Sequence, residues 1–180
     1  MFTNSYKYRH SFNITMIIDL KQNVFFRGFA FEVFAEKFLR KENNNSFIFR
    51  TNRFSNLGIL RNYYKLNLKL INNLQLIEKY YKSIDLIEFE INDYKTKLVN
   101  SIILYEVKSK LQERKRPVDI SKETYNRFLE LKNAGFKTKL VFIKILPDWK
   151  FSINIFDYDE FKHIALRKNR FLFGFKKWIR

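Results

Sequence analysis

Apolar side chains recur every three to four residues near the start of the chain and predict a helix over residues 24–42. The asparagine run at 43–45 favours turns over helix interiors and is expected to end this helix. Residues 46–51 have the pattern and composition of a strand. The segment 57–81 is rich in Leu, Asn and Tyr and fits a helical insertion before the next strand.

The middle of the chain holds two β-rich runs, residues 84–91 and 101–110. Asn92 and Asp93 favour a turn, so the two runs are expected to pair as antiparallel strands with a longish connection. The second run is too apolar to lie at the edge of a sheet, and we therefore expect it to be central.

A second helix is expected to begin after Ser121, whose hydroxyl can cap the helix N-terminus. It should end near Gly135, because glycine adopts the left-handed conformation common at helix C-termini. Residues 139–146 then predict a buried strand that Pro147 ends, and residues 151–156 predict a shorter strand.

These elements predict an α/β fold of the mixed α+β kind, a central mixed sheet flanked by helices in the order α-β-β-β-α-β. The core is expected to span residues 23–157, with an insertion at about 55–82 before the second core strand. Residues 1–22 are expected to form an N-terminal extension. The remainder, 158–180, predicts a helix to about residue 167 and then a basic, aromatic tail.

The composition, 46% hydrophobic and 18% aromatic over 180 residues, fits one globular domain. No stretch approaches the roughly 18 apolar residues of a membrane span, and the start lacks signal-peptide features. We therefore expect a cytoplasmic protein without membrane association. The absence of cysteine excludes disulfides and thiolate zinc sites, and two isolated histidines are too few for a histidine metal cluster, so any metal should be held by oxygen.

The net charge of +17 suits a polyanionic partner, and nucleic acid is the leading candidate. An AT-rich genome would explain much of the lysine content but not the paired arginines. The expected phosphate contacts are Lys110, Arg114, Lys115, Arg116, Lys122, Arg167 and Arg170. The alternative is that these residues form a solvated loop and a positively charged helix end.

The residues that carry chemistry are Asp85, Glu106 and Lys108. Side chains alternate along a strand, so Glu106 and Lys108 share a face, and an antiparallel partner can bring Asp85 beside them. Two close carboxylates repel unless a cation lies between them, and hard oxygen ligands suit Mg²⁺ or Mn²⁺. The Val107 carbonyl could add a ligand. Taken singly, each charged residue could equally belong to an exposed ion pair.

Asp85 with Glu106-x-Lys108 resembles the PD-(D/E)XK signature of restriction-endonuclease-like nucleases, and the predicted order of elements is the order of that family. One departure is Ile84, which stands where the family has proline. The resemblance implies a restriction-endonuclease-like core in which Asp85, Glu106 and Lys108 are catalytic and the first two bind the metal.

The first helix extends the resemblance. Arg27-Gly28-x-x-x-Glu32 is similar to a pattern of archaeal Holliday-junction resolvases, in which the helical glutamate contributes to the metal site. The resemblance therefore implies a catalytic and metal-binding role for Glu32. Glu36, one turn later, is the alternative.

The similarity to resolvases continues for about forty residues from Glu106, through the basic loop 114–116 and the helix that opens at 120–123, although the insertion is much longer than theirs. The resemblance implies a divalent-metal-dependent endodeoxyribonuclease that acts on branched DNA in recombination or repair, as a homodimer and without an organic cofactor. The alternatives are a nuclease for linear duplex, a specific site or RNA, and a non-catalytic nucleic-acid-binding protein on the same fold.

Overall fold

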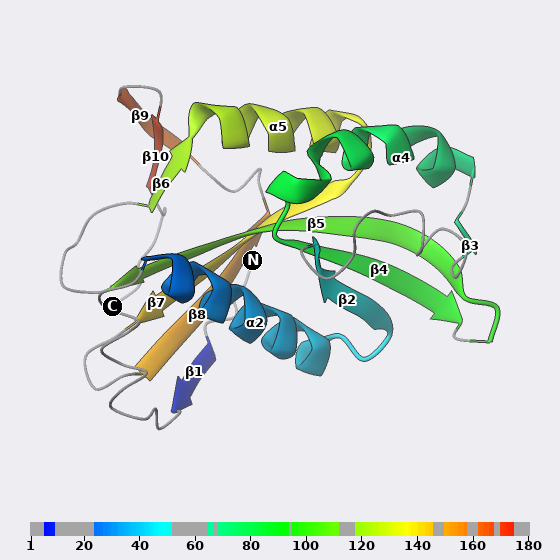
Figure 1. The fold of residues 1–180 in the computed structure, drawn as a ribbon, viewed down its shortest axis with the longest axis horizontal. Coiled ribbons are helices and arrows are strands. Elements are labelled where there is room, and N and C mark those ends of the chain that lie inside the picture. The colour runs from blue at the N-terminus through cyan, green and yellow to red at the C-terminus, as the bar shows by residue number, and fades with distance from the viewer. Residues whose placement is uncertain are drawn as a thin grey trace.

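Strands dominate the chain, with helices placed between them (Figure 1). The structure, a computed structural model, describes residues 6–9, 24–51, 65–66, 68–93, 95–111, 118–145, 150–157, 162–167 and 170–174. The elements in chain order are β1 (Tyr6–Arg9), α2 (Val24–Glu42), β2 (Ser46–Arg50), β3 (Lys65–Leu66), α4 (Leu68–Tyr80), the 3₁₀ turn η2 (Tyr81–Ser83), β4 (Leu86–Asp93), β5 (Leu98–Leu111), β6 (Val118–Ser121), α5 (Lys122–Asn133), β7 (Lys137–Ile145), β8 (Lys150–Asp157), β9 (Lys162–Arg167) and β10 (Arg170–Gly174).

The described strands form two sheets. The larger has the order β1-β8-β7-β5-β4-β2, with the short β3 beside β5. Strand β5 is parallel to β7 and to β3, and the other neighbours are antiparallel. The expected mixed α/β fold is confirmed, and the predicted order α-β-β-β-α-β corresponds to α2, β2, β4, β5, α5 and β7. The smaller sheet has the order β6-β10-β9.

Helices cover both faces of the large sheet: α4 and α5 lie on one side and α2 on the other (Figure 1). Each face has its own apolar core, because the side chains of a strand alternate. Strand β5 contributes Leu104 to the core under α4 and α5, and Tyr105 to the core under α2. By the same alternation, Glu106 is on the face covered by α4 and α5.

Helices α2 and α5 begin and end as the sequence predicts, whereas α4 covers only Leu68–Tyr80 of the segment 57–81 that was expected to be helical. Helix α2 spans the expected residues, 24–42. Ser121 caps α5, since its hydroxyl accepts a hydrogen bond from the Thr124 N–H at 3.1 Å. Gly135 has φ 93°, the left-handed conformation expected after a helix. Among the described residues, none of the helices has the length and apolar character to cross a membrane.

The C-terminal prediction was wrong. Residues 162–167, expected in a helix, form β9, and β10 follows within the expected tail. Strand β10 pairs with both β9 and β6, so tertiary pairing outweighs the local helical pattern. The β-branched and aromatic residues Ile164, Phe171 and Phe173 favour strands, and they were the signal for β9 and β10 that the sequence contained.

Three other segments refine the expected boundaries. Asn92 and Asp93 continue β4 instead of forming the turn, which lies at residues 95–97. Within the expected N-terminal extension, β1 pairs with β8 and joins the large sheet. Within the expected insertion, α4 places Leu74 and Ile77 in the core beneath α5. Extension and insertion therefore both contribute to the main fold.

Candidate functional site

Strand pairing brings Asp85 next to Glu106. Asp85 immediately precedes β4, and β4 pairs with β5 in a register that sets Leu86 opposite Tyr105. The next positions in this register are Asp85 and Glu106, so the two residues are neighbours. Lys108 is two residues further along β5 and shares a face with Glu106. The three predicted residues therefore lie together where β4 begins.

Hydrogen bonds on both sides hold the segment that carries Asp85. Its N–H donates to the Tyr105 carbonyl at 3.1 Å, and its carbonyl accepts from the Thr51 N–H at 3.2 Å. Its side-chain Oδ2 accepts a hydrogen bond from the Val107 N–H at 2.7 Å. The N–H and C=O of one strand residue point to the same side, so the Val107 carbonyl also faces Asp85.

Two cations hold the carboxylate of Glu106, which is 4% exposed. Its Oε1 accepts a hydrogen bond from the Lys108 ammonium. Its Oε2 lies 3.4 Å from a guanidinium nitrogen of Arg127, a buried residue of α5. Sequence reasoning missed Arg127, although Arg127 precedes Phe128 and Leu131 on the apolar stripe of α5. A charge on such a stripe needs a partner, which was the available signal.

The packing of these charges shifts their pKa values. Burial and the neighbouring Glu106 carboxylate raise the pKa of Asp85 to about 8, against the opposing effects of the Val107 N–H and of Lys108. Burial alone would lower the pKa of Lys108, but the charge and hydrogen bond of Glu106 raise it above its ordinary value. Lys108 is therefore an ammonium at neutral pH and can donate hydrogen bonds but not accept a proton.

The two candidate site glutamates of α2, Glu32 and Glu36, have different surroundings. Glu36 is 1% exposed, and its carboxylate is paired with Arg50 at 3.0 Å and with Arg40 at 2.9 Å. Glu32 is only partly buried. Burial raises the pKa of Glu32, Arg50 lowers it, and Glu106 raises it, so Glu32 lies within electrostatic reach of Glu106. Glu36 is thus engaged in buried ion pairs, and Glu32 remains the predicted helical residue of the site.

Comparison with known proteins adds no family. No family model and no curated protein matches the chain. The resemblance to PD-(D/E)XK nucleases therefore rests on the motif residues and on the order of the elements. One of those residues, Gly28, has no packing reason to be glycine, since a Cβ added there would meet no atom within 4 Å.

The oxygen atoms of the site suit a hard divalent cation. Asp85 and Glu106 are adjacent carboxylates whose repulsion a cation would relieve, as the raised pKa of Asp85 indicates. The Val107 carbonyl lies on the same side as Asp85. Within the described part of the chain, no group of three or more acidic, histidine or cysteine side chains is gathered at metal-binding distance. Two carboxylates and a carbonyl oxygen nevertheless suit Mg²⁺, which binds oxygen and keeps several waters of its own.

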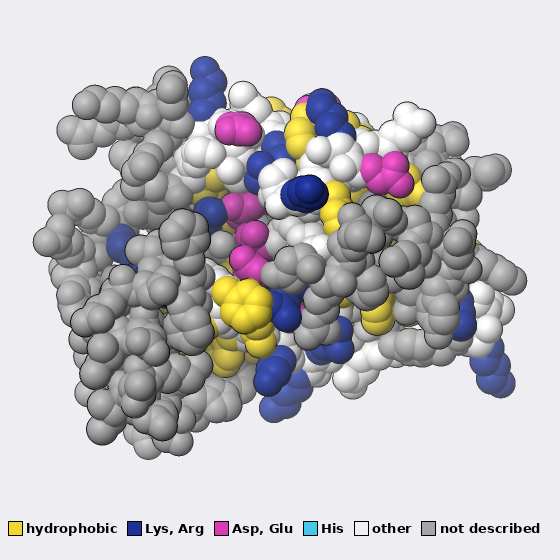
Figure 2. Space-filling model, in the orientation of Figure 1, with side chains coloured by type: hydrophobic (Ala, Val, Ile, Leu, Met, Phe, Trp, Pro, Cys, Tyr) yellow, Lys and Arg dark blue, Asp and Glu magenta, His cyan; other side chains and the backbone are white. Residues whose placement is uncertain are grey.

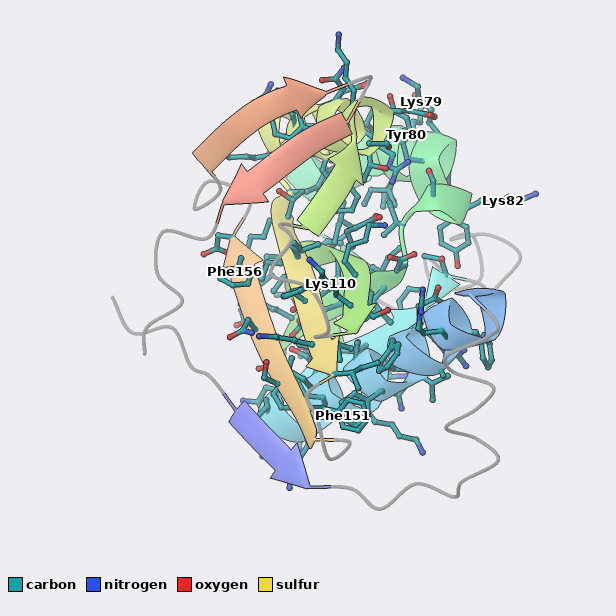
Figure 3. The ribbon with its side chains drawn as sticks, turned by 90° about the vertical axis from the view of Figure 1, so that its left-hand side faces the viewer. Lys79, Tyr80, Lys82, Lys110, Phe151 and Phe156 are labelled. Carbon is teal, nitrogen blue, oxygen red and sulfur yellow. The ribbon has the colours of Figure 1, made fainter. Side chains whose placement is uncertain are left out.

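The structure describes the backbone of some of the predicted phosphate contacts, and among these Lys110 is on β5. Lys110 lies near the C-terminal end of this strand (Figure 3). Residues 114–116 lie outside the described residues. Lys122 is exposed at the start of α5, and the strand registers set Arg170 opposite both Ser121 and Arg167. Backbone pairing thus places Arg167 and Arg170 in the small sheet, whose strand β6 leads directly into Lys122 and α5.

One face of the molecule carries both signs of charge. Figure 2 shows acidic side chains near the centre of this face, with basic and apolar side chains beside them. A carboxylate centre flanked by cations is the arrangement that a metal ion and a phosphodiester together require.

Proposed function

We propose that the chain is a divalent-metal-dependent endonuclease of the PD-(D/E)XK type that hydrolyses phosphodiester bonds of DNA. The observation that carries the proposal is the convergence of Asp85 with Glu106 and Lys108 where β4 begins, anchored by the 2.7 Å hydrogen bond from Val107 to Asp85. A buried carboxylate pair beside an ammonium is costly in a purely structural site and therefore favours a functional one. The order of α2, β2, β4, β5, α5 and β7 supports the same family.

Each residue has a distinct task in this proposal. Asp85, Glu106 and the Val107 carbonyl would hold Mg²⁺ or Mn²⁺, with Glu32 approaching from α2. When bound, the ion supplies Lewis-acid activation of the phosphate and of a water molecule. Lys108, which stays protonated, orients that water or stabilises the negative charge that develops on the phosphate oxygens. Lys110 and the basic residues near α5 hold the neighbouring phosphates of the backbone.

Branched DNA is the proposed substrate, with the protein acting as a homodimer. This part of the proposal rests on the resemblance to Holliday-junction resolvases and on the net charge of +17. Two symmetric cuts on a four-way junction require two active sites related by a two-fold axis, which a homodimer provides.

A cleavage assay on matched linear, flap and four-way DNA tests the proposal. We expect cleavage of the four-way substrate with Mg²⁺ or Mn²⁺ and none with a chelator. Asp85→Ala and Glu106→Ala should each abolish cleavage and leave DNA binding largely intact, because these groups hold the metal and not the phosphate. Lys137→Gln, which removes a charge from the exposed Lys137–Glu90 ion pair, is the control.

The outcomes separate the alternatives. Equal cleavage of linear and four-way DNA would replace the resolvase assignment with a less selective nuclease. Tight DNA binding without cleavage under either metal would indicate a non-catalytic binding protein. Full turnover in Asp85→Ala or Glu106→Ala would refute the site itself.

A further inference from the structure

Arg127 contacts the centre of the proposed site from inside the fold. Its guanidinium lies 3.4 Å from Glu106 Oε2, and 9% of the residue is exposed. Its Nε is buried without a hydrogen-bond partner. A buried guanidinium with an unsatisfied donor is costly, so a reason for it should be sought in what it touches.

The packing of α5 fixes the position of this guanidinium. Phe128 and Leu131, the buried apolar residues of α5, hold the helix against the sheet. Arg127 lies next to Phe128 on the same stripe, with its guanidinium carbon 5.5 Å from the ring centroid. The guanidinium is therefore buried between the helix and the sheet, against Glu106. Arg127 thus places a buried positive charge next to Glu106, on the interior side of the site.

Arg127 and Lys108 each contact one oxygen of the Glu106 carboxylate. Lys108 donates to Oε1, and Arg127 lies against Oε2. A divalent ion that binds Glu106 must share these oxygens with both cations, and it is repelled by each of them. Lys108 is already assigned a task in the reaction. Arg127 has no other acidic partner among the described ion pairs.

We propose that Arg127 is a positioning residue that orients Glu106 and competes with the divalent ion for its carboxylate, so that Arg127 limits how tightly the free protein binds metal. This inference rests on the proposed metal-dependent nuclease function. The orienting effect supports turnover, whereas the competing charge weakens metal binding. Removing the charge should therefore shift turnover and metal affinity in opposite directions, which the loss of a merely structural ion pair does not do.

Direct Mn²⁺ binding to the full chain without DNA, followed by electron paramagnetic resonance at pH 8, tests the competition. Arg127→Met keeps the length of the side chain without its charge and should bind Mn²⁺ about tenfold more tightly than wild type, because a unit charge beside the ion is removed. Cleavage by the same variant should fall. Arg127→Lys should restore affinity close to that of wild type, and Lys137→Gln should leave it unchanged.

A second variant separates charge from folding. Arg127→Gln keeps hydrogen-bond donors for Glu106 but lacks the charge, so it should tighten Mn²⁺ binding as Arg127→Met does, even if the Met variant fails to fold. If a folded Arg127→Gln variant binds Mn²⁺ no more tightly than wild type, the proposed competition is refuted. The proposed metal site would still stand in that case if wild type binds Mn²⁺ and Asp85→Asn does not. Absence of Mn²⁺ binding in every protein would overturn both proposals together.

Discussion

The raised pKa of Asp85 makes the stability of the metal-free protein depend on pH. An aspartate has a pKa near 3.8 when unfolded, and burial beside Glu106 raises the pKa to about 8 in the folded chain. Between these values the folded state holds the proton more tightly. The stabilisation from the protonated group is complete below pH 3.8 and is lost as the pH rises to about 8.

Asp85→Asn isolates this effect, because the amide stays neutral at every pH while its oxygen can still accept from the Val107 N–H. At about 1.4 kcal/mol per pH unit, wild type should lose roughly 2 to 3 kcal/mol of its unfolding free energy between pH 6 and 8 relative to the variant. Above pH 8 to 9 the difference should level off. Added Mg²⁺ should reduce the loss in wild type alone, since the ion compensates the paired carboxylates.

Urea unfolding in a chelator, followed by circular dichroism at several pH values, measures the difference. Asp157→Asn, which removes a carboxylate at the exposed end of β8, is the matched control. Parallel pH profiles for wild type and Asp85→Asn would refute the reasoning, because they would mean that Asp85 is already ionised beside Glu106 at pH 6.

The remaining predictions concern separate parts of the molecule. Lys108→Ala should reduce turnover by at least a hundredfold with little change in DNA binding. Glu32→Gln should slow cleavage and weaken metal affinity. An effect of substitution at Glu36 but not at Glu32 would make Glu36 the helical residue of the site. Neutralising residues 114–116 should make the slope of log affinity against log salt shallower by roughly two to three, and an unchanged slope would mean a solvated loop. Ser121→Ala should cost about 1 kcal/mol of unfolding free energy through the lost α5 cap, measured by urea titration.

Local patterns predicted the elements whose boundary signals lie within a short segment of the chain. The apolar spacing of α2 and the Ser121 and Gly135 signals around α5 are properties of short segments, and both helices formed as expected. The antiparallel pairing of β4 with β5 also joins segments close in sequence. The C-terminal segment differs because β9 needs β10, and β10 needs β6, which is about fifty residues earlier. A helical reading of the isolated segment could not include that partner.

The contacts of the site also differ in whether the sequence pattern alone could predict them. The neighbourhood of Asp85 and Glu106 follows from the period of a strand and one antiparallel register, so it could be argued from spacing alone. The contact of Arg127 with Glu106 depends instead on the rotation of α5 over the sheet, which Phe128 and Leu131 fix by packing. The sequence places a charge on an apolar stripe but does not give its partner. The contact of Arg127 with Glu106 also places a positive charge beside that carboxylate. For that reason metal binding by Arg127 variants tests the three-dimensional arrangement, which the motif does not specify.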